Sequence, residues 1–184
     1  PAVHVAEKGG PFRGLHLAFH DRPFLAYTGI MGGHWFMTSQ FSITLPLVAP
    51  AVSGNASAVA WVYAVNSAVA VFLGYPMPRF VERRMGARRA LISGVLVTAI
   101  GVALIGFSQE TISLMAAVLV YSIGIVLARP TEQTVAAGLA NPAALGSYFG
   151  VAALAVAFGG GLGNYAGGIL YDAVDASAAD AEGV

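Results

Sequence analysis

The chain contains no cysteine and very little charge over its 184 residues. Without cysteine this sequence can form no disulfide and no thiolate metal site. Cysteine usage therefore does not indicate whether the protein resides in an oxidising or a reducing compartment. Charged residues make up 10% of the chain, whereas a soluble domain carries roughly 25%, so too few polar side chains are present to cover a water-soluble globule. The formal net charge is zero, and it gives no indication of a nucleic-acid partner.

Hydrophobic residues make up 57% of the chain, and they fall into runs near the ~20 residues that a membrane-spanning helix needs. The sequence therefore predicts an all-α integral membrane protein with five transmembrane helices. Residues 1–22 are expected to form a cytoplasmic linker, 23–171 the transmembrane part, and 172–184 an acidic tail on the outside. The predicted spans are residues 24–48, 58–77, 90–107, 112–128 and 145–170.

A basic stretch from Gly74 to Leu91 lies between the second and third predicted spans and reads as a short loop. The linker and the segment after the fourth span hold the remaining Lys and Arg residues, while the loops after spans one, three and five hold none. Because Lys/Arg-rich loops stay on the cytoplasmic side, we expect a cytoplasmic start and a periplasmic or extracellular end. The cations of the predicted loop are Arg79, Arg83, Arg84, Arg88 and Arg89.

Small residues recur at three- and four-residue steps along the fifth predicted span. In lipid, small side chains let two helix backbones approach closely, so this stripe predicts a helix-packing interface. An interface that slides and one that packs statically are both compatible with the pattern. The glycines of the stripe are Gly146, Gly150, Gly160 and Gly168, interspersed with Ala153, Ala157 and Asn164.

Motifs for catalysis, cofactors and metals lack the context that their chemistry needs. Residues 159–163 are rich in glycine like a dinucleotide loop, but no strand precedes them. His16 and His20 have the spacing of a helical metal pair without a third placed ligand, so no metal site is predicted. An intramembrane serine protease would pair a serine with a histidine on another span, and His34 has no such partner. These patterns predict no cofactor, and they leave a structural or channel subunit and a membrane enzyme as alternatives.

The segment from Glu82 to Arg89, Glu-Arg-Arg-Met-Gly-Ala-Arg-Arg, resembles the Asp-Arg-x-Gly-Arg-Lys loop signature of the major facilitator superfamily. Glu replaces Asp, and the leading Gly74 lies further upstream. Short runs along the chain, such as Arg22-Pro-Phe24, are similar to bacterial drug–proton antiporters of that superfamily. The resemblance implies a C-terminal-half fragment that corresponds to helices seven to eleven of the superfamily fold. The loop motif comprises Gly74, Arg79, Glu82, Arg83, Arg84, Gly86, Arg88 and Arg89.

This resemblance also implies proton-coupled efflux of drugs or other small molecules by alternating access, in the bacterial inner membrane. The expected partners are the lipid bilayer, the absent six-helix first half of the transporter, a small-molecule substrate and protons. The first and fourth spans would line the cavity, so their polar residues are the candidates for the substrate path. These candidates are Tyr27, His34, Thr38, Gln40, Tyr121 and Ser122.

His34 is the one ionisable group that the predicted spans place at membrane depth, and no carboxylate is expected there. Tyr27, His34 and Thr38 fall within a narrow arc of one helix face, since steps of seven and four nearly complete whole turns. A neutral histidine that hydrogen-bonds between helices is the alternative role for His34. Proton coupling is therefore expected to reside in the missing half.

Overall fold

The computed structural model describes residues 11–182, which form helices joined by short turns with no strand among them. The all-helical prediction is confirmed for this part of the chain. The first ten residues of the predicted linker lie outside the described residues. The elements are α1 (Pro11–His20), α2 (Arg22–Ser53), α3 (Ala58–Leu73), α4 (Pro76–Met85), α5 (Ala87–Gly106), α6 (Thr111–Leu139), η1 (Pro142–Ala144), α7 (Leu145–Leu154), the π-helical turn η2 (Ala155–Gly159) and α8 (Gly160–Glu182).

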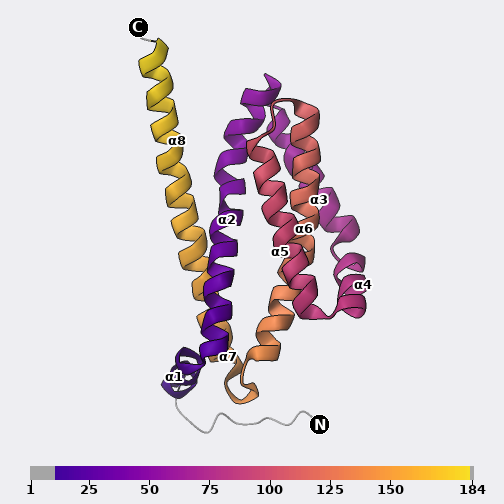
Figure 1. Ribbon diagram of the computed structural model, residues 1–184, viewed down its shortest axis with the longest axis vertical. Coiled ribbons are helices and arrows are strands. Elements are labelled where there is room, and N and C mark those ends of the chain that lie inside the picture. The colour runs from indigo at the N-terminus through magenta and orange to yellow at the C-terminus, as the bar shows by residue number, and fades with distance from the viewer. Residues whose placement is uncertain (1–10, 183–184) are drawn as a thin grey trace.

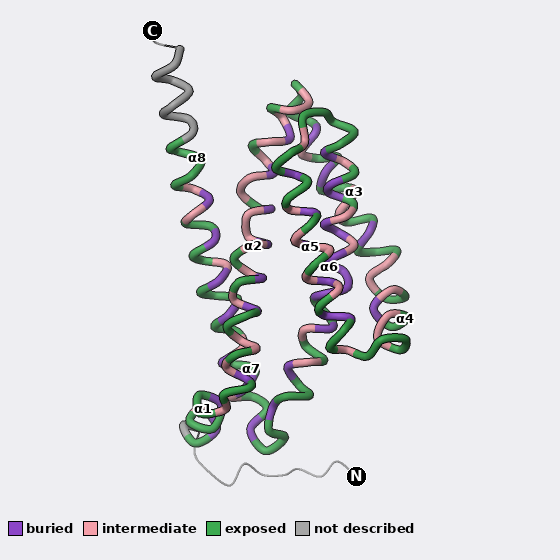
Figure 2. The backbone as a smooth tube through the Cα atoms, in the orientation of Figure 1, coloured by how far each residue is buried: buried purple, intermediate pink, exposed green. Residues whose placement is uncertain are grey.

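The helices form two groups that run roughly along the long axis of the molecule, as Figure 1 shows. In one group the long helices α2 and α8 lie side by side, and in the other α3, α5 and α6 pack together. α1 and the C-terminal end of α8 lie at opposite ends of this axis. Exposed residues occur on every helix in Figure 2, and large apolar side chains such as Phe72, Ile100 and Leu170 are among them. Such a surface suits contact with lipid or with further helices.

Within residues 11–182, three helical segments are long and apolar enough to cross a membrane: Ala87–Gly106, Thr111–Leu139 and Pro142–Ala173. The pair α3 and α4, bent by 58° at their junction, would be a fourth. α2 is not among these segments, because its many polar residues lower its hydropathy. The predicted count of five spans is not confirmed and stays a prediction.

α2 has defined start and stop signals. Asp21 caps its first turn by accepting a hydrogen bond from the Phe24 backbone N–H at 3.2 Å, and Gly54 ends it in a left-handed conformation at φ 67°. The helix runs through Pro46 and Pro50 to Ser53, past the predicted end of the first span at residue 48. A proline removes one backbone hydrogen bond from a helix interior, but packing against neighbouring helices can hold the helix together.

The basic stretch is helical, so its predicted loop structure is wrong. Pro76 begins α4, where its fixed φ and missing N–H suit a first helical turn. Gly86, at φ 78°, is the only break before α5 begins. Arg79 donates a hydrogen bond to the Tyr75 hydroxyl and lies over its ring. All five arginines of the stretch are exposed, namely Arg79, Arg83, Arg84, Arg88 and Arg89.

α6 also continues past its expected end. The sequence predicted that the fourth span stops at Arg129-Pro130, but the helix runs on to Leu139. Thr131 and Ala136 are buried beyond the proline. Their tertiary packing outweighs the hydrogen bond that Pro130 cannot make. This continuation carries the next polar residues toward α2.

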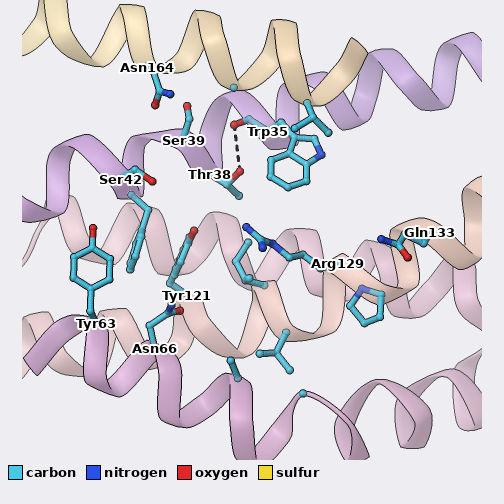
Figure 3. Close-up of a pocket in the computed structure, with 18 of the residues that line it drawn as sticks. Trp35, Thr38, Ser39, Ser42, Tyr63, Asn66, Tyr121, Arg129, Gln133 and Asn164 are labelled. Carbon is cyan, nitrogen blue, oxygen red and sulfur yellow. Dashed lines mark hydrogen bonds between the residues drawn. The ribbon is translucent and has the colours of Figure 1, made fainter. Parts of the chain in front are cut away.

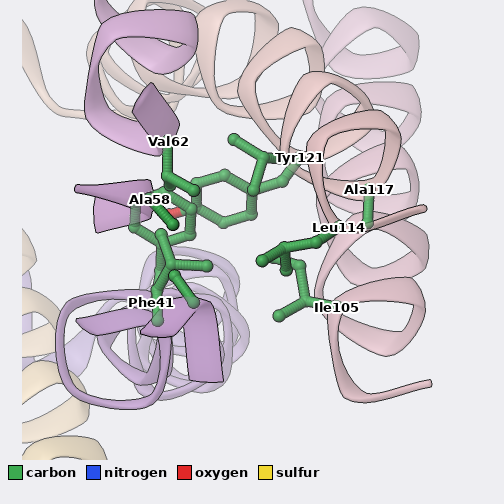
Figure 4. Close-up of a cluster of buried hydrophobic side chains, with 10 residues drawn as sticks. Phe41, Ala58, Val62, Ile105, Leu114, Ala117 and Tyr121 are labelled. Atoms are coloured by element: carbon green, nitrogen blue, oxygen red, sulfur yellow. The ribbon is translucent and has the colours of Figure 1, made fainter. Parts of the chain in front are cut away.

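α5 and α6 pack at close range because glycines face the opposite backbone. A Cβ on Gly94 would lie 2.8 Å from the Ala128 backbone nitrogen, and one on Gly101 would collide with the Tyr121 backbone. Gly124 of α6 faces Thr98 of α5 in the same way. The largest buried apolar cluster joins this pair to α2 and α3 (Figure 4). It includes Phe41, Leu45, Val62, Leu114, Val118 and Tyr121.

Candidate functional site

A cleft of about 850 Å³ lies between α2, α3, α6 and the η2–α8 segment. Polar side chains from facing helices point into it in Figure 3, with Thr38, Ser39 and Ser42 of α2 opposite residues of α3 and α6. Arg129 is the only charged residue on the cleft wall within the described chain. The labelled polar residues of the remaining wall are Tyr63, Asn66, Tyr121, Gln133 and Asn164.

Aromatic rings form one end of the cleft wall. Phe41 and Tyr121 stack with ring centres 4.1 Å apart, and Tyr63 meets Phe41 edge to face at 6.1 Å. The Asn66 side-chain oxygen accepts a hydrogen bond from the Ser122 hydroxyl at 3.0 Å, which ties α3 to α6 behind the wall. A large concave site with aromatic faces and a few polar groups suits a small organic molecule.

The structure brings only part of the predicted substrate path to the cleft. Thr38 and Tyr121 line it, and Tyr27 lines a neighbouring pocket. His34 is buried, and its Nδ1 has no hydrogen-bond partner among the described residues. Thr38 is also largely buried, with its hydroxyl bonded to the Trp35 backbone carbonyl at 3.2 Å.

Gln40 and Ser122 hold helices together instead of facing the cleft. The Gln40 side-chain amide donates a hydrogen bond of 2.7 Å to the Gly163 backbone carbonyl on α8. The Ser122 hydroxyl bonds the Val118 carbonyl of its own helix at 2.7 Å as well as Asn66. Their polar groups are therefore satisfied by protein partners, which removes the cost of burying them.

A side pocket of about 330 Å³ adjoins the cleft and contains residues that the sequence did not predict. Trp35, Arg129 and Gln133 border both spaces, and Glu132 borders the side pocket. The Glu132 carboxylate accepts a hydrogen bond from Trp35 Nε1 at 3.0 Å, and its backbone carbonyl accepts one from the Tyr27 hydroxyl at 2.8 Å. The guanidinium carbon of Arg129 lies 5.3 Å from the centre of the Trp35 ring.

The expectation that no carboxylate lies at membrane depth stays a prediction, and Glu132 on α6 lies beyond the predicted end of the fourth span at residue 128. Glu132 is half-buried within Thr111–Leu139, one of the helices that could cross a membrane. The prediction missed it because the fourth span was expected to end at residue 128. Val135 and Ala136, which pack into the protein one turn later, are the apolar signal that the helix continues.

Two sets of glycines along the α7, η2 and α8 segment face in different directions. Gly159, Gly163 and Gly167 lie against α2, where an added Cβ would meet Gly32, Phe36 with Ser39, and Gln40 respectively. The π-helical turn η2 helps to set this face, because a π turn holds one residue more than an α turn. Among the described residues, a Cβ on any glycine of the predicted packing stripe meets no atom within 4 Å beyond the backbone of its own helix. Those glycines are Gly146, Gly150, Gly160 and Gly168.

The chain is similar to proteins of known family. The family model for the Major Facilitator Superfamily matches residues 23–179. The chain is 32% identical over 173 residues to multidrug resistance protein MdtH of Yersinia pestis (strain Pestoides F) and of Yersinia pseudotuberculosis serotype O:1b (strain IP 31758). Each alignment covers 94% of this chain and 43% of the relative. The chain therefore spans less than half the length of these curated relatives.

Proposed function

Since the chain belongs to the major facilitator superfamily, we propose that it forms helices seven to eleven of a drug-exporting secondary transporter. Membership of this family points to a lipid environment, a small-molecule substrate and transport instead of catalysis. The proteins that the chain matches are named for multidrug resistance, and they favour drugs as the substrate class and the bacterial inner membrane as the location.

The cleft between α2, α3, α6 and α8 is the observation that carries this proposal. Its volume of about 850 Å³ is large enough for a drug-sized molecule, and its wall combines stacked aromatic rings with neutral polar groups. We assign Thr38 and Tyr121 to substrate contact, together with Asn66 and Arg129 from the facing helices. His34, Gln40 and Ser122 support this wall from behind.

Transport by alternating access requires a second half that rocks against this one. The open glycine face at Gly146, Gly150, Gly160 and Gly168 supports such a contact, because no residue in the described part of the chain covers it. Small residues would let a helix of the first half approach closely. Gly160→Leu in the complete transporter is then expected to impair transport, while an unchanged transport rate would mean that this face meets lipid or the cavity.

The charge distribution supports a cytoplasmic start and a cytoplasmic α4. The arginines of α4 and of the first turn of α5 are exposed, as a helix lying against the anionic cytoplasmic leaflet requires. An impermeant thiol reagent should therefore reach Gly86→Cys from the cytoplasmic side only and Gly54→Cys from the opposite side only. The reverse pattern would refute this orientation.

Everted membrane vesicles test the function. Respiration makes such vesicles acid inside, and a drug–proton antiporter releases part of that gradient when its substrate is added. Vesicles that contain the complete transporter should respond to some members of a drug panel, such as ethidium, whereas vesicles without it should not. Absence of any response, with the protein present at normal levels, would argue against proton-coupled efflux.

A further inference from the structure

We infer that the Glu132 carboxylate is a proton-binding site of this half, and that it is linked to the cleft through Trp35. The inference rests on the proposed function and deepens it, because it places a proton site beside the substrate cleft. It starts from Glu132 as a half-buried carboxylate on α6, a helix long and apolar enough to cross a membrane. In transporters, ionisable groups on such helices that face a cavity mark proton relays.

The carboxylate is reachable by water. Glu132 is half-buried and lines the side pocket of about 330 Å³, which could hold several waters at roughly 30 Å³ each. This pocket borders the cleft along Trp35, Arg129 and Gln133. Water in the side pocket is therefore the proposed source and acceptor of the proton.

The carboxylate is not fixed in its ionised form by a direct ion pair. Within residues 11–182, Arg129 of the same helix lies over the face of the Trp35 indole, while Glu132 accepts a hydrogen bond from the N–H edge of that ring. Both side chains therefore contact the same indole, Arg129 at its face and Glu132 at its edge. A direct Arg–carboxylate pair would strongly favour the ionised acid, and its absence leaves protonation accessible.

Few other groups that can change charge face Glu132. α2 contributes two groups that can change charge. The Tyr27 hydroxyl donates a hydrogen bond to the Glu132 backbone carbonyl, and the His34 ring is buried one turn before Thr38. α6 itself contributes Arg129. The wall from α7 and η2 is apolar and does not titrate; it consists of Phe149, Ala152, Ala153 and Val156.

Protonation of Glu132 changes the cleft because Trp35 lines both the cleft and the side pocket. The ionised carboxylate accepts a charge-assisted hydrogen bond from Trp35 Nε1, and the neutral acid accepts a weaker one. Proton binding therefore loosens Trp35 and leaves Arg129 without its counter-charge at the edge of the cleft. A substrate that contacts Trp35 in its present position binds better to the ionised form. By linkage, binding of that substrate releases the proton, which is the exchange that antiport requires.

Fluorine NMR of the complete transporter labelled with 5-fluorotryptophan tests this link directly. The Trp35 resonance, assigned by its loss in Trp35→Phe, should shift in a single step between about pH 5 and pH 9. The step should vanish in Glu132→Gln and persist in Asp172→Asn, which removes an exposed carboxylate on α8. Trp61, exposed on α3, provides an internal reference.

A Trp35 resonance that does not change with pH in the wild type overturns the inference, whether or not Glu132→Gln folds. A step that survives unchanged in Glu132→Gln also overturns it. In everted vesicles, Glu132→Gln should lose proton release on addition of ethidium while it still binds ethidium. If no drug releases protons from vesicles that contain the wild-type transporter, the proposed function is contradicted. The NMR titration tests the link between Glu132 and Trp35 separately, because it requires no transport.

Discussion

Two glycine-mediated helix contacts organise this molecule, and they differ in what surrounds them. Between α5 and α6, glycines on both helices face the opposite backbone, and the pair is enclosed by the apolar cluster around Leu114 and Val118. Between α2 and α8, the glycines are on α8, and Gln40 adds a polar bond across the contact. The open cleft borders this second contact.

The difference indicates a division of roles. α6 is held from several sides, since it packs on α2 and α3 as well as on α5, and it cannot shift without disturbing the core. Among the described helices, α8 packs on α2 and its own η2 turn, so it can shift with less disruption. We interpret α5–α6 as the fixed scaffold and α2–α8 as the adjustable wall of the cleft.

Gly101→Ala should have the largest effect on stability. The new Cβ would collide with the Tyr121 backbone, and overpacking of this kind costs about 1–3 kcal/mol. We expect a clear fall in the melting temperature of the detergent-solubilised protein. Gly106→Ala is the matched control on the same helix, because its Cβ meets no atom within 4 Å. Equal melting temperatures for both variants would show that α5 and α6 are not in close contact.

Gly163→Ala should have a smaller effect than Gly101→Ala. Its Cβ would meet the Ser39 hydroxyl, which can rotate away, and the Phe36 carbonyl oxygen, which α8 can avoid by moving outward. Gly161→Ala, with open space at its Cβ, is the neighbouring control. If Gly163→Ala destabilises as much as Gly101→Ala in the same melting assay, the α2–α8 contact is as rigid as the scaffold.

Gln40→Ala should have the smallest effect on stability. It removes one hydrogen bond between α2 and α8, and such bonds average about 0.6 kcal/mol in membrane proteins. Transport of all substrates should fall together, in proportion to protein level. Gln133→Ala, on the cleft wall, should change the substrate profile while the protein level stays normal. The opposite assignment of these two phenotypes would place Gln40 on the substrate path.

The sequence predicted the helical class and the superfamily, and both are confirmed. Its errors come from local signals that tertiary packing overrides. Pro130 and the arginine-rich stretch looked like helix ends, yet burial at Thr131 and the prolines that open α4 keep both segments helical. Polarity on a predicted span identified Thr38 and Tyr121 as cleft residues.

The same polarity could not separate these residues from Gln40 and Ser122. All four are polar groups on helices, and which of them faces a cavity depends on the rotation of each helix against its neighbours. Asn66 was missed because it lies on the second predicted span, which the resemblance did not assign to the cavity wall. Arg129 was missed because it lies just beyond the expected end of the fourth span. Their place at the cleft follows from the approach of α3 and α6.

Cysteine accessibility within the cleft tests the central claim, that this cleft is the substrate path. The chain has no cysteine of its own, so Asn66→Cys and Ile100→Cys introduce single thiols into it. A water-soluble thiol reagent should label Asn66→Cys in membranes, and a transported drug should slow that labelling, whereas Ile100→Cys on the exposed apolar side of α5 should resist labelling. If Asn66→Cys is not labelled at all, or if no transported drug slows its labelling, the cleft is not the substrate path.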